Sequence, residues 1–300
     1  MTVPTYRRET FLTDDLDVAC DVYGPTSGDT VVLMHGFPDD VHAYDAVVPD
    51  LVSDGFRVLV PYLRGYGPTR FLDPDAPRMA QQAAIGEDLF QLLDASGTDT
   101  ALLAGYDWGG RAACITAIMH PERVKGLVTI TGYNVKIGRQ PAPPSDPKQL
   151  QALWYQWLFG TKPGRVALET NRDALCEAMW RWWSPTWNFT PEQFARTAAS
   201  FHNPDFVDVV IHSYSHRWAG AEGDPRFDAI EAHLATKPPI SVPSVILHGI
   251  DDGVAPVESS RSHTALFPEG TPRIEVQDAG HFLPWERPDA VVEALRRLAS

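Results

Sequence analysis

The sequence predicts an α/β protein built on a mostly parallel, doubly wound sheet. Short apolar runs such as Thr30–Met34 and Ala101–Ala104 recur along the chain, and continuous apolar character is typical of strands buried on both faces. Segments with apolar residues at helical spacing alternate with these runs over short links. This order of strand and helix predicts a parallel sheet that is covered by helices on both faces.

The first strands are expected to form a hairpin. Tyr6–Leu12 and Leu16–Tyr23 are rich in β-forming residues, and Thr13-Asp14-Asp15 between them is a turn signal. The further strands are expected at Thr30–Met34, Phe56–Val60, Ala101–Ala104, Gly126–Ile130, Pro243–Leu247 and Arg273–Val276. Helices are expected at Ala80–Ala95, at Gly109–Met119 and at Pro288–Leu298, where a proline stands at the first helical position.

The alternation stops after Gly132 and returns at Pro243. Residues 134–240 are helical in pattern, interrupted by prolines, and hold seven of the nine tryptophans. We therefore predict a helical lid at 134–240, inserted after the sixth strand of a core domain made of residues 1–133 and 241–300. An aromatic lid is consistent with an apolar roof over a substrate cavity.

The charge balance excludes several kinds of partner. The chain has 25 Lys and Arg against 39 Asp and Glu, a net charge of −14, which argues against nucleic acid and against an anionic membrane surface. It contains no apolar run long enough for a transmembrane helix and no visible secretion signal. The three cysteines are far apart and form no disulfide or metal pattern. We expect a cytoplasmic monomer or homodimer with a small apolar or amphipathic substrate.

A candidate nucleophile follows the Ala101–Ala104 strand. Gly105-Tyr106-Asp107-Trp108-Gly109 joins this strand to the next helix, and the glycines on both sides allow a sharp turn that exposes the central side chain. Taken alone, Asp107 is explained more simply as an acidic residue at a helix N-terminus, where the dipole favours negative charge. The order of two later groups favours catalysis. Asp251 or Asp252 follows one strand, and His281 follows the next.

With these turns the chain resembles the α/β-hydrolase family over nearly its whole length, and within it the epoxide hydrolases, with haloalkane and haloacetate dehalogenases as relatives. The resemblance depends on the HGFP loop at 35–38, the GYDWGG elbow at 105–110, the HGIDDGVAP turn at 248–256 and the DAGHF turn at 278–282. It implies the α/β-hydrolase fold with a nucleophile, acid and histidine in that chain order. The family spacing favours Asp252 over Asp251 as the acid.

The resemblance also implies supporting residues. The backbone N–H groups of Phe37 and Trp108 correspond to the oxyanion hole. Tyr155, in a Tyr-Gln pair, and Tyr214 match the two lid tyrosines of epoxide hydrolases, although each is also explained as an amphipathic core residue. One departure is Tyr62, which stands where related hydrolases usually have Asp before the Leu-Arg-Gly-Tyr-Gly stretch. This affects the expected loop structure only.

An aspartate at the nucleophile position predicts displacement at saturated carbon. A carboxylate attacking an ester or amide would form an unstable anhydride, whereas attack on an epoxide or alkyl halide forms an ordinary alkyl ester. Asp107 needs no base for this attack, because aspartate is ionised at neutral pH. His281 is then expected to activate a water that hydrolyses the ester, oriented by Asp252.

The leaving group distinguishes the alternatives. An epoxide needs a proton or strong hydrogen bonds, which the hydroxyls of Tyr155 and Tyr214 would supply. A dehalogenase using the same Asp107 ester is the second hypothesis, with the Trp108 indole as a weak halide donor. Arg111 lies near the elbow, where it is explained more simply as a helix residue paired with an acid. A non-catalytic protein that binds a small molecule is the third hypothesis.

The expected substrate pocket also includes side chains next to the catalytic turns and in the lid. These residues are His35, Pro38, Trp154, Trp157 and Phe282. No metal-binding motif, phosphate-binding loop or complete dinucleotide fingerprint is present in the sequence. We therefore expect no cofactor and no metal.

Overall fold

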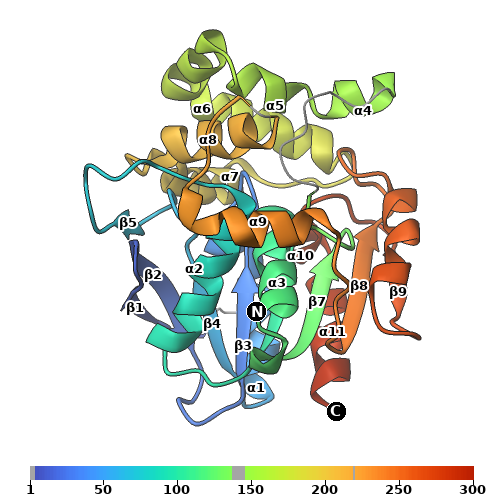
Figure 1. The fold of residues 1–300 in the computed structure, drawn as a ribbon. Helices are drawn as coiled ribbons and strands as arrows, with labels where there is room; N and C mark the ends of the chain where they lie inside the picture. The colour runs from blue at the N-terminus through green and yellow to red at the C-terminus, as the bar shows by residue number, and fades with distance from the viewer. Residues whose placement is uncertain (1–3, 137–145, 219) are drawn as a thin grey trace.

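The computed structural model describes residues 4–136, 146–218 and 220–300 and contains a nine-stranded sheet (Figure 1). The predicted lid residues 137–145 and 219 lie outside this description. The strand order is β1-β2-β4-β3-β6-β7-β8-β9, and β5 pairs with β2. The strands are β1 Arg7–Leu12, β2 Leu16–Tyr23, β3 Thr30–Met34, β4 Arg57–Pro61, β5 Arg70–Phe71, β6 Ala101–Gly105, β7 Val124–Ile130, β8 Ser244–Gly249 and β9 Arg273–Val276.

The sheet is parallel from β4 through β9 and antiparallel at the β1–β2 edge, so the predicted fold class is confirmed. Arg7 pairs with Val22 and Leu12 with Asp17, as expected for the predicted hairpin. Every residue of β3 and β6 is buried, in agreement with their apolar sequences. One strand was missed. The two residues of β5 are too few to leave a periodic pattern, and β7 before the helical insertion is therefore the seventh strand rather than the sixth.

The strand order reverses direction beside β3. This strand pairs with β4 on one side and with β6 on the other, although β6 comes later in the chain. The loops that leave the carboxyl ends of β3 and β6 therefore diverge and leave a crevice between them. In open α/β sheets such a switch point is where ligands bind.

Helices cover both faces of the sheet. In Figure 1, α2 and α3 lie in front of the strands, whereas α11 packs against β6, β7 and β8 from the other side. The helices are α1 Val48–Ser53, α2 Gln82–Ala95, α3 Asp107–Met119, α4 Pro147–Ala152, α5 Trp154–Phe159, α6 Lys162–Trp183, α7 Pro191–Ala198, α8 Phe206–Arg217, α9 Asp228–Ala235, α10 Leu283–Glu286 and α11 Pro288–Ala299.

The helices α4 to α9 all lie between β7 and β8 in the chain, and we call this part the helical segment. Figure 1 shows α4 to α8 above the carboxyl ends of the strands. Its aromatic side chains pack onto the loop after β3. The Phe37 ring lies 5.5 Å from Tyr214 and 6.2 Å from Tyr155, measured between ring centroids. The Trp180 indole N–H donates to the carbonyl of Pro38 at 2.7 Å.

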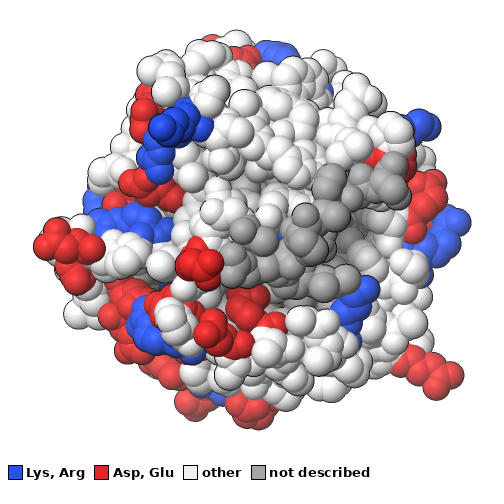
Figure 2. Space-filling view, turned by 45° about the horizontal axis from the view of Figure 1, so that its top comes forward, with Lys and Arg blue, Asp and Glu red and all other residues white. Residues whose placement is uncertain are grey.

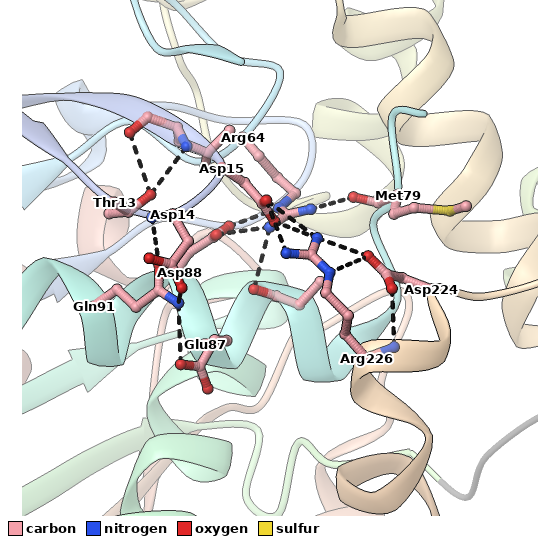
Figure 3. Close-up of polar contacts among 12 residues, drawn as sticks. Thr13, Asp14, Asp15, Arg64, Met79, Glu87, Asp88, Gln91, Asp224 and Arg226 are labelled. Atoms are coloured by element: carbon pink, nitrogen blue, oxygen red, sulfur yellow. Dashed lines mark hydrogen bonds and ion pairs between the residues drawn. The ribbon is translucent and has the colours of Figure 1, made fainter. Parts of the chain in front are cut away.

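Ion pairs join the part of the helical segment just before α9 to the turn between β1 and β2 in the core (Figure 3). Arg226, in the short 3-10 helix Pro225–Phe227, pairs with Asp15 at 2.9 Å and with Asp224 at 2.7 Å. Beside them Arg64 pairs with Asp88 on α2 at 2.6 Å. The contacts of Arg226 therefore join the turn of the first hairpin to a segment more than 200 residues later in the chain. None of the described helices has both the length and the apolar character needed to span a membrane.

Candidate active site

The loop after β6 holds Asp107 in a strained backbone conformation. Asp107 is the first residue of α3 and has φ of +48°, a left-handed conformation that costs a non-glycine residue about 1 kcal/mol or more. The turn is possible because its neighbours are glycines. A Cβ atom on Gly109 would lie 2.2 Å from the Met34 carbonyl oxygen, and one on Gly36 would lie 2.6 Å from the Asp107 Cβ. The local sequence therefore forces the Asp107 carboxylate out of the strand–helix turn.

Three loops bring Asp107, His281 and Asp252 together. His281 Nδ1 lies 2.9 Å from Asp252 Oδ2, and His281 Nε2 lies 3.8 Å from Asp107 Oδ2. His281 is buried, and its Nε2 atom has no hydrogen-bond partner among the described residues. The side chains therefore stand in the order carboxylate, imidazole, carboxylate, with the free imidazole nitrogen directed toward Asp107.

The structure distinguishes the two adjacent aspartates after β8. Asp252 is buried, and its Oδ1 accepts hydrogen bonds from the backbone N–H groups of Val254 and Ala255 at 2.9 and 2.7 Å. Asp251 instead accepts a hydrogen bond from the Thr186 hydroxyl at 3.2 Å, away from the imidazole. The carboxylate that contacts the histidine is thus that of Asp252, which the family spacing favoured.

The surroundings of His281 act on its pKa in opposite directions. Burial by itself lowers the pKa, since it disfavours the charged imidazolium. The carboxylates of Asp252 and Asp107 outweigh burial, and the pKa of His281 is raised above its ordinary value of 6.5. The pair is therefore suited to accept a proton at Nε2 and to keep the resulting positive charge in a buried position.

The two backbone N–H groups expected in the oxyanion hole lie on the loop after β3 and at the start of α3, and one of them contacts the Asp107 carboxylate. The N–H of Phe37 donates to Asp107 Oδ1 at 2.9 Å. Trp108 is the second residue of α3, where a backbone N–H has no acceptor within its own helix. The rings of Phe37 and Trp108 stack with centroids 5.7 Å apart. One carboxylate oxygen is thus held by the loop after β3, which leaves Oδ2 as the freer one.

A cavity of about 510 Å³ opens over Asp107. The residues on its wall include the catalytic candidates Asp107, Tyr155, Tyr214 and His281, together with Gln156, Trp218 and residues 254–256. Its volume is in the range of pockets that enclose a small organic ligand, about 300–1,000 Å³. The helical segment therefore contributes two phenol side chains to the same space that holds the carboxylate.

The two tyrosine hydroxyls differ in their partners. The Tyr155 hydroxyl accepts a hydrogen bond from Gln156 Nε2 at 2.9 Å, and Gln156 Oε1 in turn accepts from the Trp218 indole at 3.1 Å. Because its oxygen already accepts from Gln156, the Tyr155 proton remains available for donation. The Tyr214 hydroxyl is buried and has no partner of normal hydrogen-bond geometry in the described residues. Burial raises the pKa of both tyrosines, so each stays protonated at neutral pH.

Five side chains expected in the substrate pocket do not lie on the wall of this cavity. His35 is fully buried and accepts a hydrogen bond from the Leu63 N–H at Nε2, while burial lowers its pKa to about 4. Pro38 is buried and its carbonyl is bonded to Trp180. These two residues support the loop after β3, since their polar groups are directed into the core.

The other three are aromatic residues that pack on aromatic neighbours. Phe282 is fully buried against Trp180, with ring centroids 5.2 Å apart. Trp157 packs on Trp218 at 4.9 Å. Trp154 packs on Trp182 at 5.9 Å, beside a separate groove. The sequence showed that the segment is aromatic but did not show which faces of its helices point toward Asp107.

Four Lys and Arg side chains also line the cavity, and the sequence analysis singled out only one of them, Arg111. The four are Arg111, Lys136, Lys148 and Arg217. Arg111 was expected to pair with an acid, but it forms no ion pair with a described residue. Helical spacing is the signal that was available, because Arg111 follows Asp107 by four residues and Arg217 follows Tyr214 by three. In the described parts of the chain no group of three or more His, Cys, Asp or Glu side chains is placed to hold a metal ion.

Comparison with known proteins identifies the family. The profile of the alpha/beta hydrolase fold matches residues 29–288. The chain belongs to the α/β-hydrolase fold family. A crystal structure from Klebsiella pneumoniae, of a protein provisionally named an epoxide hydrolase, is 36% identical, covers 97% of each chain and superposes with a TM-score of 0.92.

Two sequence relatives extend over most of this α/β hydrolase. Epoxide hydrolase A of Mycobacterium tuberculosis is 24% identical, over 91% of this chain and 90% of its own length. The AB hydrolase superfamily protein YfhM of Bacillus subtilis is also 24% identical, with the same coverage of 91% and 90%. The chain is therefore a member of a hydrolase family, and the proteins to which it is similar include an epoxide hydrolase.

Proposed function

We propose that this α/β hydrolase opens an epoxide to a vicinal diol through a covalent ester with Asp107. The observation that carries the proposal is the pair of tyrosine hydroxyls, Tyr155 and Tyr214, on the wall of the cavity that holds Asp107. A carboxylate nucleophile and two phenol donors are the groups that epoxide opening needs on opposite sides of the ring. The helical segment then acts as the lid at 134–240, since it supplies both phenols.

In the first step Asp107 Oδ2 attacks one carbon of the epoxide. The C–O bond of the ring breaks, and the developing alkoxide takes a proton from Tyr155 or Tyr214, because an alkoxide is more basic than a phenolate. The Phe37 N–H holds Oδ1, which becomes the carbonyl oxygen of the ester. The two donors are the Tyr214 hydroxyl, which has no partner of normal hydrogen-bond geometry among the described residues, and the Tyr155 hydroxyl, whose oxygen accepts from Gln156.

In the second step water hydrolyses the ester. His281 Nε2 takes a proton from a water that attacks the ester carbonyl carbon, and Asp252 stabilises the imidazolium. The N–H groups of Phe37 and Trp108 stabilise the tetrahedral oxyanion, and each such donor is worth roughly 3–4 kcal/mol in comparable sites. Collapse of this intermediate releases the diol and the Asp107 carboxylate, and the His281 proton restores the tyrosine.

A specific observation also favours a second candidate, a dehalogenase that uses the same ester. The indole N–H of Trp108 is buried and unpaired among the described residues, and a weak donor of this kind suits a halide leaving group. Trp108 does not line the cavity, however, whereas both tyrosines do. The epoxide reaction is therefore the better supported of the two.

The experiment that tests the function is ester trapping with His281→Gln. This variant keeps the nucleophile but lacks the base for the second step, so we expect the covalent intermediate to accumulate. The variant is incubated with an epoxide panel and a haloalkane panel, and its intact mass is measured. An increase equal to the whole epoxide, located on Asp107 by peptide mapping, supports the proposal.

Two other outcomes would contradict the proposal. An increase in intact mass equal to the haloalkane less its halogen supports the dehalogenase. If neither panel modifies Asp107, the covalent mechanism is wrong and a binding protein without turnover becomes the better explanation. Asp107→Asn is the matched control, since asparagine tolerates a positive φ and the variant should show no adduct.

A further inference from the structure

Four Lys and Arg side chains line the cavity of Asp107, and three of them also line a small adjoining space, whereas the fourth, Lys148, belongs to α4. Arg111 comes from α3, Lys136 from the chain after β7, and Arg217 from the end of α8. The same three residues also line an adjoining space of about 20 Å³. They are separated by up to 106 positions in sequence, so only the packing of α8 over the sheet brings them together.

None of these three cations forms an ion pair with an acidic side chain of the described residues, although Asp107 and Asp146 line the same cavity. Residues 137–145 and 219 contain no Asp or Glu in the sequence. The Nε atoms of Arg111 and Arg217 are buried without a hydrogen-bond partner, and Arg111 is only 6% exposed. Glu231 lines the small adjoining space, but its oxygens accept from the Ala83 N–H at 3.0 Å and from Gln82 Nε2 at 3.1 Å.

Such an arrangement is costly in the free protein. Buried charges are normally paired, because desolvation without a counter-charge disfavours the charged form. Burial and the neighbouring Arg217 and Arg111 lower the pKa of Lys136 to about 7. Burial and Arg111 lower the pKa of Arg217 to about 10. The three side chains therefore repel each other, and an anion placed among them would relieve both the repulsion and the missing hydrogen bonds.

Arg111 differs from the other arginine that is fully buried among the described residues. The other buried arginine, Arg64, pairs with Asp88 (Figure 3). On the face shown in Figure 2, basic side chains are scattered among acidic ones and form no broad patch. The net charge of the chain is −14, yet the three cations in this cavity have no ion pair with a described residue. Low-dielectric walls of one charge concentrate the field on a bound ligand of the opposite charge.

We propose that Arg111, Lys136 and Arg217 form an anion subsite and that the epoxide substrate carries a carboxylate group. This rests on the proposed function for the epoxide part of the substrate. The charge balance favours a single negative charge, since the three cations already face the carboxylate of Asp107. The planar guanidinium groups of Arg111 and Arg217 match a carboxylate in geometry as well as charge.

The test compares two epoxides that differ only in this charge. The wild-type enzyme is assayed with trans-3-phenyloxirane-2-carboxylate and with the corresponding carboxamide, which has the same shape and no charge. We expect kcat/KM for the carboxylate to exceed that for the carboxamide by about tenfold or more, the value of a charge-assisted contact. In Arg217→Gln this ratio should fall by about tenfold.

A matched control separates the subsite from net charge. Arg165→Gln removes an exposed arginine of α6 that pairs with Asp208, so the carboxylate to carboxamide ratio should remain as in the wild type. The inference is overturned if the wild type prefers the carboxamide, or if Arg217→Gln and Arg165→Gln have the same ratio as the wild type. Lys136→Met provides a second subsite variant if Arg217→Gln does not fold.

Thermal unfolding gives a readout that does not depend on turnover. Phenylacetate should raise the Tm of the wild type more than phenylacetamide does, and Arg217→Gln should lose this difference. The unliganded Arg217→Gln protein should be at least as stable as the wild type, because a positive charge that repels Arg111 and Lys136 has been removed. If phenylacetate stabilises only the wild type but neither epoxide is turned over, the anion subsite stands and the epoxide hydrolase assignment fails. If phenylacetate has no effect, the subsite is wrong whatever the enzyme hydrolyses.

Discussion

Two regions enclose the cavity, and they hold their functional side chains in different ways. At the carboxyl edge of the sheet, Asp107, Asp252 and His281 lie in tight turns just after strands. Hydrogen bonds of 2.7–2.9 Å hold Asp107 to the Phe37 N–H and hold Asp252 to the Ala255 N–H and to His281. In the helical segment, Tyr155 and Tyr214 are held by ring packing. Their rings lie 5.2 Å apart and nearly perpendicular, and Trp183 lies 5.0 Å from Tyr155.

This difference assigns separate parts of the proposed reaction to the two regions. The sheet edge forms and hydrolyses the ester, and its backbone turns leave little freedom. The helical segment handles the leaving oxygen and, through Arg217, the choice of substrate. The helices of this segment can change their packing without disturbing the strands, so substrate preference can vary while the ester chemistry is kept. The following predictions test whether the sheet edge and the helical segment have these separate roles.

The largest effect is expected at the buried acid of the sheet edge. Asp252→Asn leaves the side-chain shape but removes the charge that orients and stabilises the His281 imidazolium, so hydrolysis of the ester should slow by roughly 10²–10⁴-fold. The adjacent change Asp251→Asn is the matched control and should alter the rate by less than about threefold, since the Asp251 carboxylate accepts from Thr186 and does not contact His281 in the described residues. Single-turnover kinetics measure this step. Equal losses in the two variants would contradict the assignment of Asp252.

The next effect concerns the phenols of the helical segment. Tyr155→Phe and Tyr214→Phe should each slow ring opening by about tenfold to a hundredfold, the worth of one hydrogen bond to a charged oxygen. Formation of the ester should slow, whereas its hydrolysis should be less affected, and rapid-quench measurements separate the two rates. Tyr6→Phe, at an exposed tyrosine, serves as the control. If hydrolysis slows as much as ester formation, the helical segment also takes part in the second step.

A smaller, graded effect is expected from pH. His281 must be neutral to act as the base, and its pKa is raised above 6.5 by Asp252 and Asp107 against the opposing effect of burial. Ester hydrolysis should therefore fall about tenfold per pH unit below this raised pKa. In Asp252→Asn the inflection of the pH–rate profile should move to lower pH. Burial lowers the pKa of His281, and the variant lacks the Asp252 charge that raises it. An inflection that stays in place would show that the imidazole is not the titrating base.

The smallest effect is expected where the two regions meet far from the cavity. Arg226→Gln removes the ion pairs with Asp15 and Asp224, and the Arg226 side chain is more than half exposed. Exposed pairs contribute about 0–1 kcal/mol, so the loss of unfolding free energy should not exceed about 1 kcal/mol. Chemical denaturation measures it, with ester trapping as a check that the site is intact. A larger loss would mean that the contact shown in Figure 3 holds the helical segment in place.

The sequence by itself was sufficient for eight of the nine strands and for the residues of the turns. Buried parallel strands are continuous apolar runs, and the elbow at Asp107 needs glycines at fixed neighbouring positions. Short stretches of sequence are therefore enough to predict both. The chain order of Asp107, the two aspartates and His281 followed from the same local patterns. These features are readable because each depends on residues that are neighbours in the chain.

Tertiary structure decided what depends on distant residues. It decided that Asp252 rather than Asp251 contacts His281, that the ring of Phe282 lies in the core rather than in the cavity, and that two residues form the edge strand β5. It also brought Lys136 and Arg217 to Arg111. Helical spacing shows that side chains share a face, but the packing of one helix on another decides what that face meets. For this protein, the local turns specified the proposed catalytic residues, and the placement of the helical segment specified the cavity that they line.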